Sequence, residues 1–354
     1  METELAASSQ NPLLTVRNLK TQIHTDIGVV RAVENVSFSV EAGQTLGIVG
    51  ESGCGKSITA LSIMGLLPGG NAKVAGGQIL YNRSEGETLD LATLKPNGAQ
   101  MRSIRGNEIA MIFQEPMSSL NPVYTIGDQI MEAVILHQGV NKTEARRRAI
   151  KMLDMVGIPA SSQRVDEYPH QLSGGMRQRV MIAIALSCNP RILIADEPTT
   201  ALDVTVQAQI LELIKQLQGE FNMALVLITH DLGVVREVAD NVAVMYFGRV
   251  VEYAPATKIF KNPSHPYTQR LLKAIPRIGN REELQQIDGS VPSAFSIRKG
   301  CDFAPRCLEV KQKCKDQLPE MELLEAQHQV RCWLRQSIKS TNDKEGAKST
   351  NNNE

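Results

Sequence analysis

The pattern of apolar and polar positions divides the chain into stretches with different expected structure. Residues 13–50 alternate apolar and polar side chains around the turn-forming Gly28 and Gly43. This alternation predicts antiparallel strands that end in a buried strand at Thr45–Val49. Apolar positions return at helical spacing between residues 125 and about 157, so helices are expected there.

Short apolar runs alternate with helical patterns in the later part of the chain. The runs RILIAD, ALVLI and NVAVMY predict strands, and the stretches VQAQILELIKQLQ and LGVVREVA between them predict helices. Alternation of this kind is typical of a largely parallel sheet with right-handed crossovers. The expected fold class is therefore α/β, with an antiparallel β part contributed by the N-terminal residues.

The amino-acid composition narrows the classes of protein that fit this pattern. The chain has 354 residues, with 38 Lys and Arg against 38 Asp and Glu, and 42% of its residues are apolar. This length predicts one large domain with an appendage, or two domains. The balanced charge lacks the basic character of a nucleic-acid-binding domain, so no nucleic-acid partner is expected.

The sequence gives no sign of a membrane span or of secretion. No apolar stretch approaches the ~18 residues that a membrane-spanning helix needs. The first residues, METELAASSQNP, begin acidic and lack the apolar core of a secretory signal. A cytosolic chain is expected, and in a reducing cytosol clustered cysteines favour metal binding over disulfides.

Prolines recur after residue 255, which predicts a boundary between two regions at that point. Residues 12–254 form the expected first domain, and residues 255–335 form a second region that contains four cysteines. The remaining residues, 336–354, are polar and of low complexity, so a disordered tail is expected there.

A glycine-rich segment after the predicted strand matches the phosphate-binding motif G-x-x-x-x-G-K-[ST]. Its glycines let backbone amides turn toward phosphates, Lys56 places an ammonium against the β- and γ-phosphates, and Ser57 offers a hydroxyl to Mg²⁺. The alternative is an ordinary glycine-rich turn, which the strand before the motif and the helix after it disfavour. The predicted ATP-binding residues here are Gly50, Glu51, Ser52, Gly53, Cys54, Gly55, Lys56 and Ser57.

A second phosphate-site element follows at RILIADEP, where a buried strand presents Asp196 at its C-terminal end. This carboxylate is expected to hold Mg²⁺, and Glu197 beside it is expected to act as general base for the attacking water. The alternative, a pair of capping carboxylates before a turn, is disfavoured by the phosphate-binding loop upstream. Inside that loop, we expect the helix N-terminus and Lys56 to lower the pKa of the Cys54 thiol and to make it reactive.

The segment LSGGMRQR at residues 172–179 resembles the signature of ATP-binding-cassette ATPases. Physically the segment is an anion site made of a serine hydroxyl, glycine amides and a helix N-terminus. The resemblance implies that it grips the nucleotide held by a partner subunit, so that two ATP molecules lie between two cassettes. The residues to which this role is assigned are Ser173, Gly174, Gly175 and Met176.

Further positions match the same family in order along the chain. Gln114 matches the glutamine that contacts Mg²⁺ and water and senses the membrane subunit, and Asp203 matches a loop at the dimer interface. His230 matches the histidine that contacts the γ-phosphate, and it joins Glu197 as an expected catalytic residue. The family stacks adenine on an aromatic side chain of the first strands. The flat ring offered here is that of His24.

The resemblance implies a fold and a domain plan. The fold is a phosphate-loop cassette with a mixed RecA-like sheet core, an antiparallel β subdomain, an α-helical signature subdomain at about residues 115–175, and a small cysteine-containing C-terminal region. The cofactors implied are ATP and Mg²⁺, with Ser57, Gln114 and Asp196 as the Mg²⁺ ligands.

Three segments, FQEPMSSLNP, YPHQLS and HPYTQ, resemble the ATPase subunits of dipeptide, oligopeptide and nickel permeases. This resemblance implies an ATPase on the cytoplasmic face of a bacterial cytoplasmic membrane that drives import of dipeptides or oligopeptides. Its implied partners are a paralogous ATPase in a heterodimer, two membrane permease subunits and an extracytoplasmic peptide-binding protein. Other cargoes, namely nickel, a glycan or an antimicrobial peptide, stay open.

Classes outside transport fit less well. Cassette ATPases of DNA repair usually insert a long coiled coil before the signature, for which this chain has no room, and translation members usually carry two cassettes in one chain. A metal-sensing or redox protein would not need the ATPase motifs.

Four late cysteines, Cys301, Cys307, Cys314 and Cys332, match neither a paired zinc ribbon nor a ferredoxin run. Their spacing alone leaves a four-thiolate metal site and unlinked small apolar side chains as equal alternatives. The basic residues nearby would offset the charge of four thiolates. The permease ATPases that this chain resembles include members with a [4Fe–4S] cluster here, so a cluster with a structural or regulatory role is expected.

Overall fold

The computed structural model describes residues 12–83, 86–114, 119–200, 202–274, 287, 289, 294–295 and 299–335. The predicted tail at 336–354 and residues 115–118, at the expected start of the helical subdomain, lie outside these residues. No helix in the described part of the chain is both long and apolar enough to cross a membrane.

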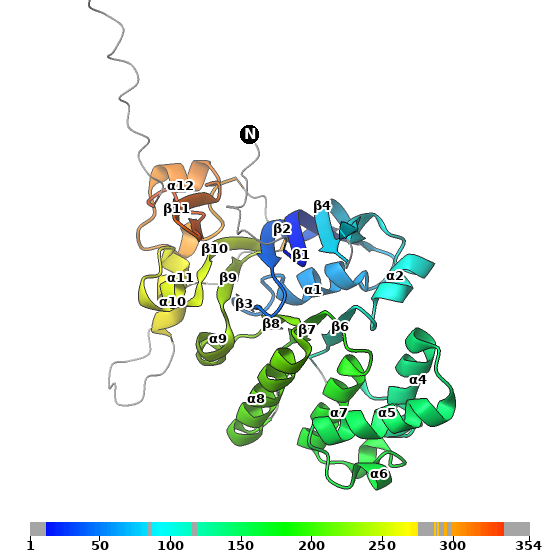
Figure 1. The fold of residues 1–354 in the computed structure, drawn as a ribbon. Coiled ribbons are helices and arrows are strands. Elements are labelled where there is room, and N and C mark those ends of the chain that lie inside the picture. Colours follow the sequence, from blue (N-terminus) through cyan, green and yellow to red (C-terminus); the bar gives the residue numbers. More distant parts are fainter. Residues whose placement is uncertain are drawn as a thin grey trace, which may run out of the picture.

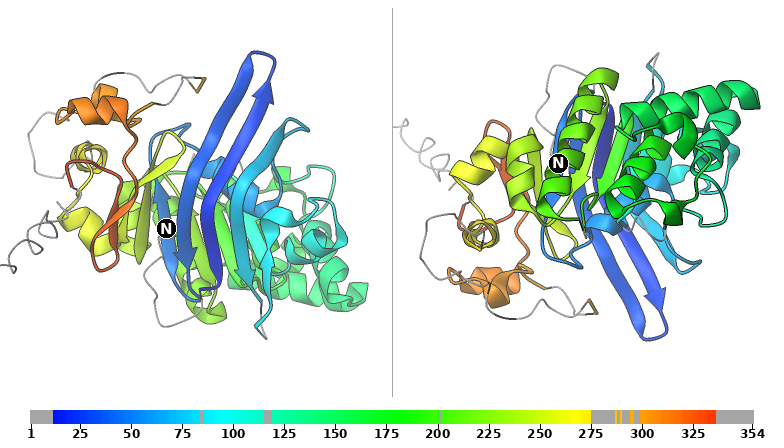
Figure 2. Two further views of the ribbon diagram at one scale, coloured as in Figure 1. Left: turned by 90° about the horizontal axis from the view of Figure 1, so that it is seen from above. Right: turned by 90° about the horizontal axis from the view of Figure 1, so that it is seen from below.

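Two sheets form the body of the described chain (Figure 1). The smaller is antiparallel, in the order β2-β1-β4-β5, and its strands bury alternate side chains as the sequence pattern predicts. Strands β1 and β2 form a long hairpin that extends beyond the rest of the sheet (Figure 2). The strands are β1 (Leu14–Thr25), β2 (Gly28–Val40), β4 (Ala72–Asn82) and β5 (Thr88–Asp90).

The larger sheet has the order β11-β12-β10-β9-β3-β8-β7-β6 among the described residues. Strands β9, β3, β8, β7 and β6 are parallel, which confirms the predicted parallel sheet, whereas β10, β12 and β11 continue it in antiparallel pairs. The bounds are β3 (Thr45–Val49), β6 (Ile109–Ile112), β7 (Ile192–Asp196), β8 (Ala224–Ile228), β9 (Asn241–Tyr246), β10 (Arg249–Pro255), β11 (Glu322–Glu325) and β12 (His328–Val330).

Helix α1 (Lys56–Met64) joins the two sheets through one apolar core. Its Ala60 and Ile63 share this core with Phe38 of the antiparallel sheet and Ile48 of the larger sheet. This packing fixes the start of α1, and therefore the phosphate-binding loop before it. The remaining helices near the sheets are α2 (Ala99–Ile104), α8 (Val204–Phe221) and α9 (Leu232–Val238), with a short 3₁₀ turn at Leu91–Thr93.

A group of helices lies on one side of the molecule (Figure 1). Side-chain caps start three of them: Thr125 accepts from the amide of Asp128, Asn141 from that of Glu144, and Ser173 from that of Met176. Their apolar faces share a core with Leu193 of the larger sheet. These elements are α4 (Ile126–Gln138), α5 (Lys142–Met155), α6 (Ser161–Arg164), a 3₁₀ turn at Pro169–Gln171 and α7 (Gly174–Leu186).

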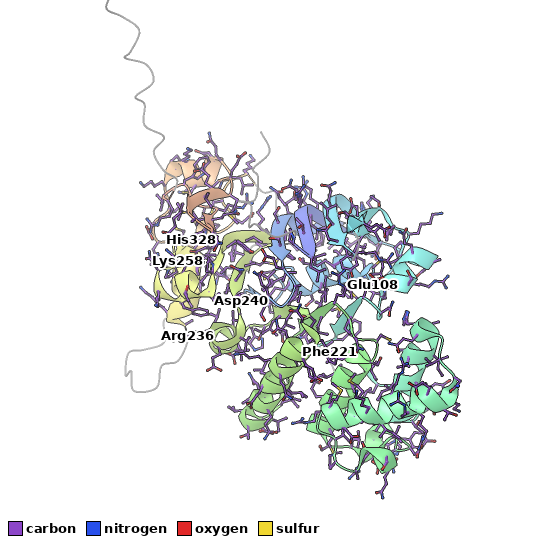
Figure 3. All side chains as sticks on the ribbon, viewed as in Figure 1. Glu108, Phe221, Arg236, Asp240, Lys258 and His328 are labelled. Atoms are coloured by element: carbon purple, nitrogen blue, oxygen red, sulfur yellow. The ribbon has the colours of Figure 1, made fainter. Side chains whose placement is uncertain are left out.

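The described part of the C-terminal region lies on the opposite side of the molecule (Figure 1). Strand β10 ends at the predicted boundary, Pro255, but β12 pairs with β10, so the region continues the main sheet. Figure 3 places Lys258 and His328 near each other in this region, and the His328 ring is 2.8 Å from the buried carboxylate of Glu252. Its helices are α10 (Ala256–Lys261), α11 (Pro266–Lys273) and α12 (Gln312–Asp316), with a 3₁₀ turn at Ala304–Arg306.

Candidate nucleotide-binding site

The phosphate-binding loop connects β3 to α1 and depends on glycine at two positions. Gly50 and Gly55 have φ values of 153° and 102°, a region that favours glycine. A Cβ atom at Gly50 would collide with the carbonyl oxygen of Met245, and one at Gly55 would collide with that of Ala32. The loop therefore passes closely under β9 and β2, and a side chain at either position would displace it.

Hydrogen bonds within this loop fix the side chain of Lys56. Its ammonium donates hydrogen bonds to the carbonyl oxygens of Gly50, at 2.8 Å, and Glu51, at 3.1 Å. The side chain is buried, so the loop, and not water, surrounds its charge. An ammonium at this place attracts the phosphates of a nucleotide.

Asp196 ends β7 at the same edge of the sheet and is only 4% exposed. Its Oδ1 atom has no hydrogen-bond partner among the described residues. Burial raises the pKa of this carboxyl, although contact with the Ser57 hydroxyl opposes the rise. A buried oxygen without a partner, next to a serine hydroxyl, is a donor set that fits Mg²⁺.

Glu197 lies in a hydrogen-bonded setting in which three predicted residues meet. Its backbone is left-handed, with φ 47°. Its Oε1 lies 3.2 Å from Nδ1 of His230, and its Oε2 accepts from Gln114 at 3.1 Å and from Thr200 at 2.9 Å. Burial alone would raise the pKa of Glu197, but these contacts with His230 and Thr200 outweigh it and lower the pKa. A carboxylate kept ionised and oriented in this way can accept a proton from water. No sequence motif singles out Thr200.

A cavity of about 190 Å³ opens beside these residues. The predicted residues that line it are Ser52, Gly53, Gly55, Lys56, Ser57, Gln114 and Glu197. Other lining residues were not predicted from the sequence: Val30, Arg31 and Ala32 of β2, together with Phe247 and Gly248 after β9. No sequence motif marks them, because they reach the cavity only through the packing of β2 and of the turn after β9 against the loop.

His24 does not line this cavity. It lies near the tip of the β1–β2 hairpin, opposite Val29, and its side chain is exposed. Its backbone exchanges hydrogen bonds with Asn71. The adenine-stacking role expected for His24 is therefore without support from the position of its side chain.

The signature residues lie away from the cavity of their own chain. Ser173 is exposed and caps α7 by accepting from the amide of Met176, and Gly174 beside it is also exposed. Asp203 is exposed as well and caps α8 by accepting from the amide of Val206. A Cβ atom at Gly175 would lie 3.1 Å from the Val206 side chain, so the two loops pack closely together.

The expectation for Cys54 is wrong. The side chain is 3% exposed, and this burial raises the pKa of the thiol although Lys56 opposes the rise. The helix N-terminus and the lysine are present as predicted, but the loop folds the sulfur inward against Gly50. Desolvation of the thiolate therefore decides the direction of the shift, and the thiol is protected rather than activated.

The four late cysteines come together around one small cavity, which His265 and Phe303 also line. Burial raises the pKa of Cys301 to about 12 and also raises that of Cys332. Among the described residues, no three His, Cys, Asp or Glu side chains are grouped closely enough to hold a metal ion. The cysteines are thus neighbours around a shared cavity without a ready-made site for a single ion.

One neighbour of the phosphate-binding loop was missed from the sequence. The guanidinium of Arg306, in the cysteine-containing region, makes a two-pronged ion pair with Glu51. The amide of Glu51 also donates to the hydroxyl of Tyr267 at 3.0 Å. Tyr267 belongs to the segment HPYTQ, but the segment gives no hint that its ring reaches the loop.

Two family models match the chain. A model described as ABC transporter matches residues 33–200, and a model described as oligopeptide/dipeptide transporter, C-terminal region, matches residues 251–314. The first match covers the phosphate-binding loop, Gln114, the signature and Glu197. The second covers β10, α10, α11 and three of the four cysteines.

Several curated proteins are similar along almost their whole length. The oligopeptide transport ATP-binding protein AppD of Bacillus subtilis is 53% identical over 323 residues, which is 91% of this chain and 96% of that protein. The dipeptide transport ATP-binding protein DppD of the same organism is 51% identical over 91% of this chain and 94% of that protein. The oligopeptide transport ATP-binding protein OppD of Haemophilus influenzae is 51% identical over 92% of this chain and 98% of that protein.

Solved structures support the same fold. The ATP-binding cassette MJ0796, solved as a dimer in a post-hydrolysis state with ADP and Pi, has a TM-score of 0.60 at 28% identity over 69% of this chain and 98% of that chain. CbiO1 from Clostridium perfringens has a TM-score of 0.58 at 26% identity over 72% of this chain and 92% of that chain. With the phosphate-binding loop, the signature and Glu197 in place, the chain belongs to the ABC transporter family of ATPases and carries the C-terminal region of its oligopeptide and dipeptide transporters.

Proposed function

We propose that this chain is the ATP-hydrolysing subunit of a bacterial ABC importer for dipeptides or oligopeptides, attached to the cytoplasmic face of the cytoplasmic membrane. The observation that carries this proposal is the meeting of Lys56, Asp196 and Glu197 at one edge of the sheet, in a chain that also has the oligopeptide transporter C-terminal region. The relatives AppD, DppD and OppD are all peptide transport ATP-binding proteins by name.

The residues at the cavity have different roles in ATP hydrolysis. The loop amides and Lys56 bind the phosphates, so that the γ-phosphate faces Glu197. Glu197 takes a proton from the attacking water, and its left-handed backbone and its contact with Thr200 keep the carboxylate in place. His230 and Gln114 orient this carboxylate from two sides. Catalysis then consists mainly of positioning and charge neutralisation.

Mg²⁺ fits the oxygen donors of Asp196 and Ser57 beside the cavity. Asp196, Ser57 and Gln114 are the residues that would hold it, and the unpartnered Oδ1 of Asp196 supports this assignment. When bound, Mg²⁺ supplies positive charge that offsets the charge of the phosphate oxygens. Burial alone makes the charged form of the Asp196 carboxyl unfavourable, and Mg²⁺ beside it would offset this cost.

The exposed signature supports action on a second ATPase subunit. Ser173, Gly174, Gly175 and Met176 open α7 at a surface away from the cavity, and Asp203 opens α8 beside them. This placement suits a paralogous cassette whose nucleotide these residues would grip. We propose that the pair works with two membrane permease subunits and an extracytoplasmic peptide-binding protein, and that Gln114 passes the nucleotide state toward the permease.

We propose a [4Fe–4S] cluster at Cys301, Cys307, Cys314 and Cys332. An all-thiolate donor set around one cavity suits iron–sulfur or zinc, and a four-iron cluster spreads its ligands further apart than a single ion does. Among the described residues no grouping would hold a single metal ion, and the proposal rests on the four thiols around one cavity. When bound, the cluster ties together four points of the C-terminal chain.

The cargo is tested by uptake of labelled dipeptides and oligopeptides in cells that lack this subunit. A wild-type copy should restore uptake, and a Glu197→Gln copy expressed at the same level should not. Nickel and glycan uptake are measured in the same cells. If peptide uptake is unchanged by the deletion while uptake of another cargo is lost, the peptide assignment is wrong and the ATPase role stands.

The cluster is tested by iron and acid-labile sulfide analysis of anaerobically purified protein, for which we expect both in equal amounts. Cys314→Ser should lose iron, whereas Cys188→Ser is a matched control because Cys188 is buried elsewhere in the chain. Zinc in place of iron, or neither metal, would refute the cluster.

A further inference from the structure

We infer that Arg306, in the cysteine-containing C-terminal region, is a positioning residue for the phosphate-binding loop, where it neutralises Glu51 and holds it away from the nucleotide phosphates. The inference deepens the proposed function and rests on the ATP site described above. It assigns to the C-terminal region a direct part in nucleotide binding by its own chain.

The contact between the two residues is close and shielded. Arg306 Nη1 lies 2.7 Å from Glu51 Oε2, and Nη2 lies 3.0 Å from Oε1, in the parallel two-bond geometry that guanidinium and carboxylate groups prefer. The Arg306 side chain is 4% exposed and that of Glu51 is 26% exposed. Ion pairs that water reaches poorly interact more strongly than surface pairs.

Aromatic residues of the C-terminal region and of β9 fix both partners. The Glu51 amide donates to the Tyr267 hydroxyl at 3.0 Å, and Arg306 also donates to the Tyr246 hydroxyl at 3.4 Å. The rings of Tyr246 and Tyr267 lie 4.7 Å apart, and both pack against Phe303. Glu51, the second residue of the phosphate-binding loop, is therefore held at its side chain and at its backbone amide by residues of one cluster.

The charge of Glu51 explains why a partner is needed. A carboxylate in a loop that receives a triphosphate repels the ligand unless a cation compensates it. Lys56 donates to the backbone carbonyl of Glu51, and so its charge is directed toward the centre of the loop. Arg306 supplies the compensating charge from outside the motif, 255 residues along the chain.

The position of Arg306 depends on the loop that carries the cysteines. Arg306 directly precedes Cys307, and its amide donates to the carbonyl of Phe303, which lines the cysteine cavity. Its own carbonyl accepts from Arg270 of α11 at 2.9 Å. A change in the 301–307 loop therefore moves the guanidinium that holds Glu51.

The test measures MgATP affinity of the purified full chain by calorimetry, together with its thermal unfolding. Arg306→Gln should weaken MgATP binding about tenfold, as expected for the loss of about 1.4 kcal/mol. The double variant Glu51→Gln with Arg306→Gln should recover most of this loss, because the uncompensated carboxylate is gone. Arg335→Gln is the control, since Arg335 pairs with Glu309 in the same region away from the loop.

The rescue separates charge compensation from simple packing. If Arg306→Gln binds MgATP as tightly as wild type, or if the double variant is as weak as the single one, the inference is overturned. A lower melting temperature with unchanged affinity also overturns it. These readouts do not involve cargo, so a failure of peptide uptake would leave them unaffected.

Discussion

The two peripheral parts of the molecule differ in how they are attached to the larger sheet. The helices α4–α7 share an apolar core with the larger sheet, in which Leu153 and Leu193 are fully buried. The C-terminal region also shares an apolar core with the larger sheet, to which Val244, Tyr267 and Phe303 belong, but buried polar groups add to this attachment. Glu252 is fully buried and accepts hydrogen bonds from the amides of Ser264 and His265 and lies 2.8 Å from His328.

This difference matters because the two kinds of contact respond to different changes. Apolar packing loses free energy in proportion to the area and volume removed. Buried charged groups depend on exact partners, and the loss of one partner leaves the other uncompensated. We therefore expect the attachment of the helical side to depend on apolar volume, and that of the C-terminal side to depend on charge as well.

The largest effect is expected at Glu197 in the nucleotide-binding site. Glu197→Gln keeps the side-chain shape but removes the proton acceptor, so ATP hydrolysis in the assembled complex should fall about 10²–10⁴-fold. Binding of MgATP should be retained, because the phosphate contacts of Lys56 are untouched. Single-turnover hydrolysis and calorimetry measure the two quantities, and full hydrolysis by the variant would refute the assignment of the base.

The apolar attachment is tested by Leu153→Ala in α5. The leucine is fully buried, so its truncation should cost about 2–5 kcal/mol of unfolding free energy. Urea unfolding of the full chain measures this cost. Leu136→Ala is the control, because Leu136 is 74% exposed in the neighbouring α4 and should change stability little. Equal effects for the two variants would contradict the assignment of α5 to the shared core.

The polar attachment is tested by Glu252→Gln in β10. An amide accepts fewer and weaker hydrogen bonds than a carboxylate, so a loss of about 1.5–3 kcal/mol is expected. The loss should be local: hydrogen exchange should speed up in β12 and α11, whereas α4–α7 should keep their protection. Faster exchange spread evenly over the chain would mean that the two parts are not attached independently.

The smallest effect is a dependence on pH. The hydrogen bond to Glu252, helped by Glu325, raises the pKa of His328, while Lys258 pairs with Glu325 on its outer side. A raised pKa in the folded state adds stability below the unfolded-state pKa of about 6.5, and this stability is lost as the pH rises through the folded-state pKa. Melting temperatures between pH 6 and 9 should show this loss.

The matched variant for this pH effect is His328→Gln, which keeps a hydrogen-bonding side chain but does not titrate in this range. It should flatten the decline in melting temperature on the alkaline side. A decline that persists unchanged in the variant would assign the effect to another group.

The sequence predicted the parts of this molecule that are encoded locally. The strand Thr45–Val49, the glycine loop after it and the strand ending at Asp196 each carry their own pattern within a few residues. The positions of Gln114 and His230 were expected from family resemblance, and both side chains contact Glu197. Local pattern and motif order were enough for this half of the site.

The remaining features depend on distant contacts that leave no local pattern. Strands β11 and β12 are short, and nothing within them indicates that β12 pairs with the distant β10, where Val330 lies opposite Glu252, or that β11 pairs with β12. The pairing of Arg306 with Glu51 spans 255 residues. The pKa of Cys54 was predicted in the wrong direction because burial of the sulfur is a result of tertiary packing.

The pairing of β12 with β10 also covers a strand edge that could otherwise promote aggregation. Without residues beyond Pro255, the side of β10 that faces away from β9 would be an exposed strand edge, with unpaired backbone groups around Glu252 and Tyr253 where β12 pairs. Such edges recruit strands from other molecules. The C-terminal region thus covers this strand edge and protects the larger sheet from self-association. A chain that is shortened at Pro255 should aggregate even if its nucleotide site forms.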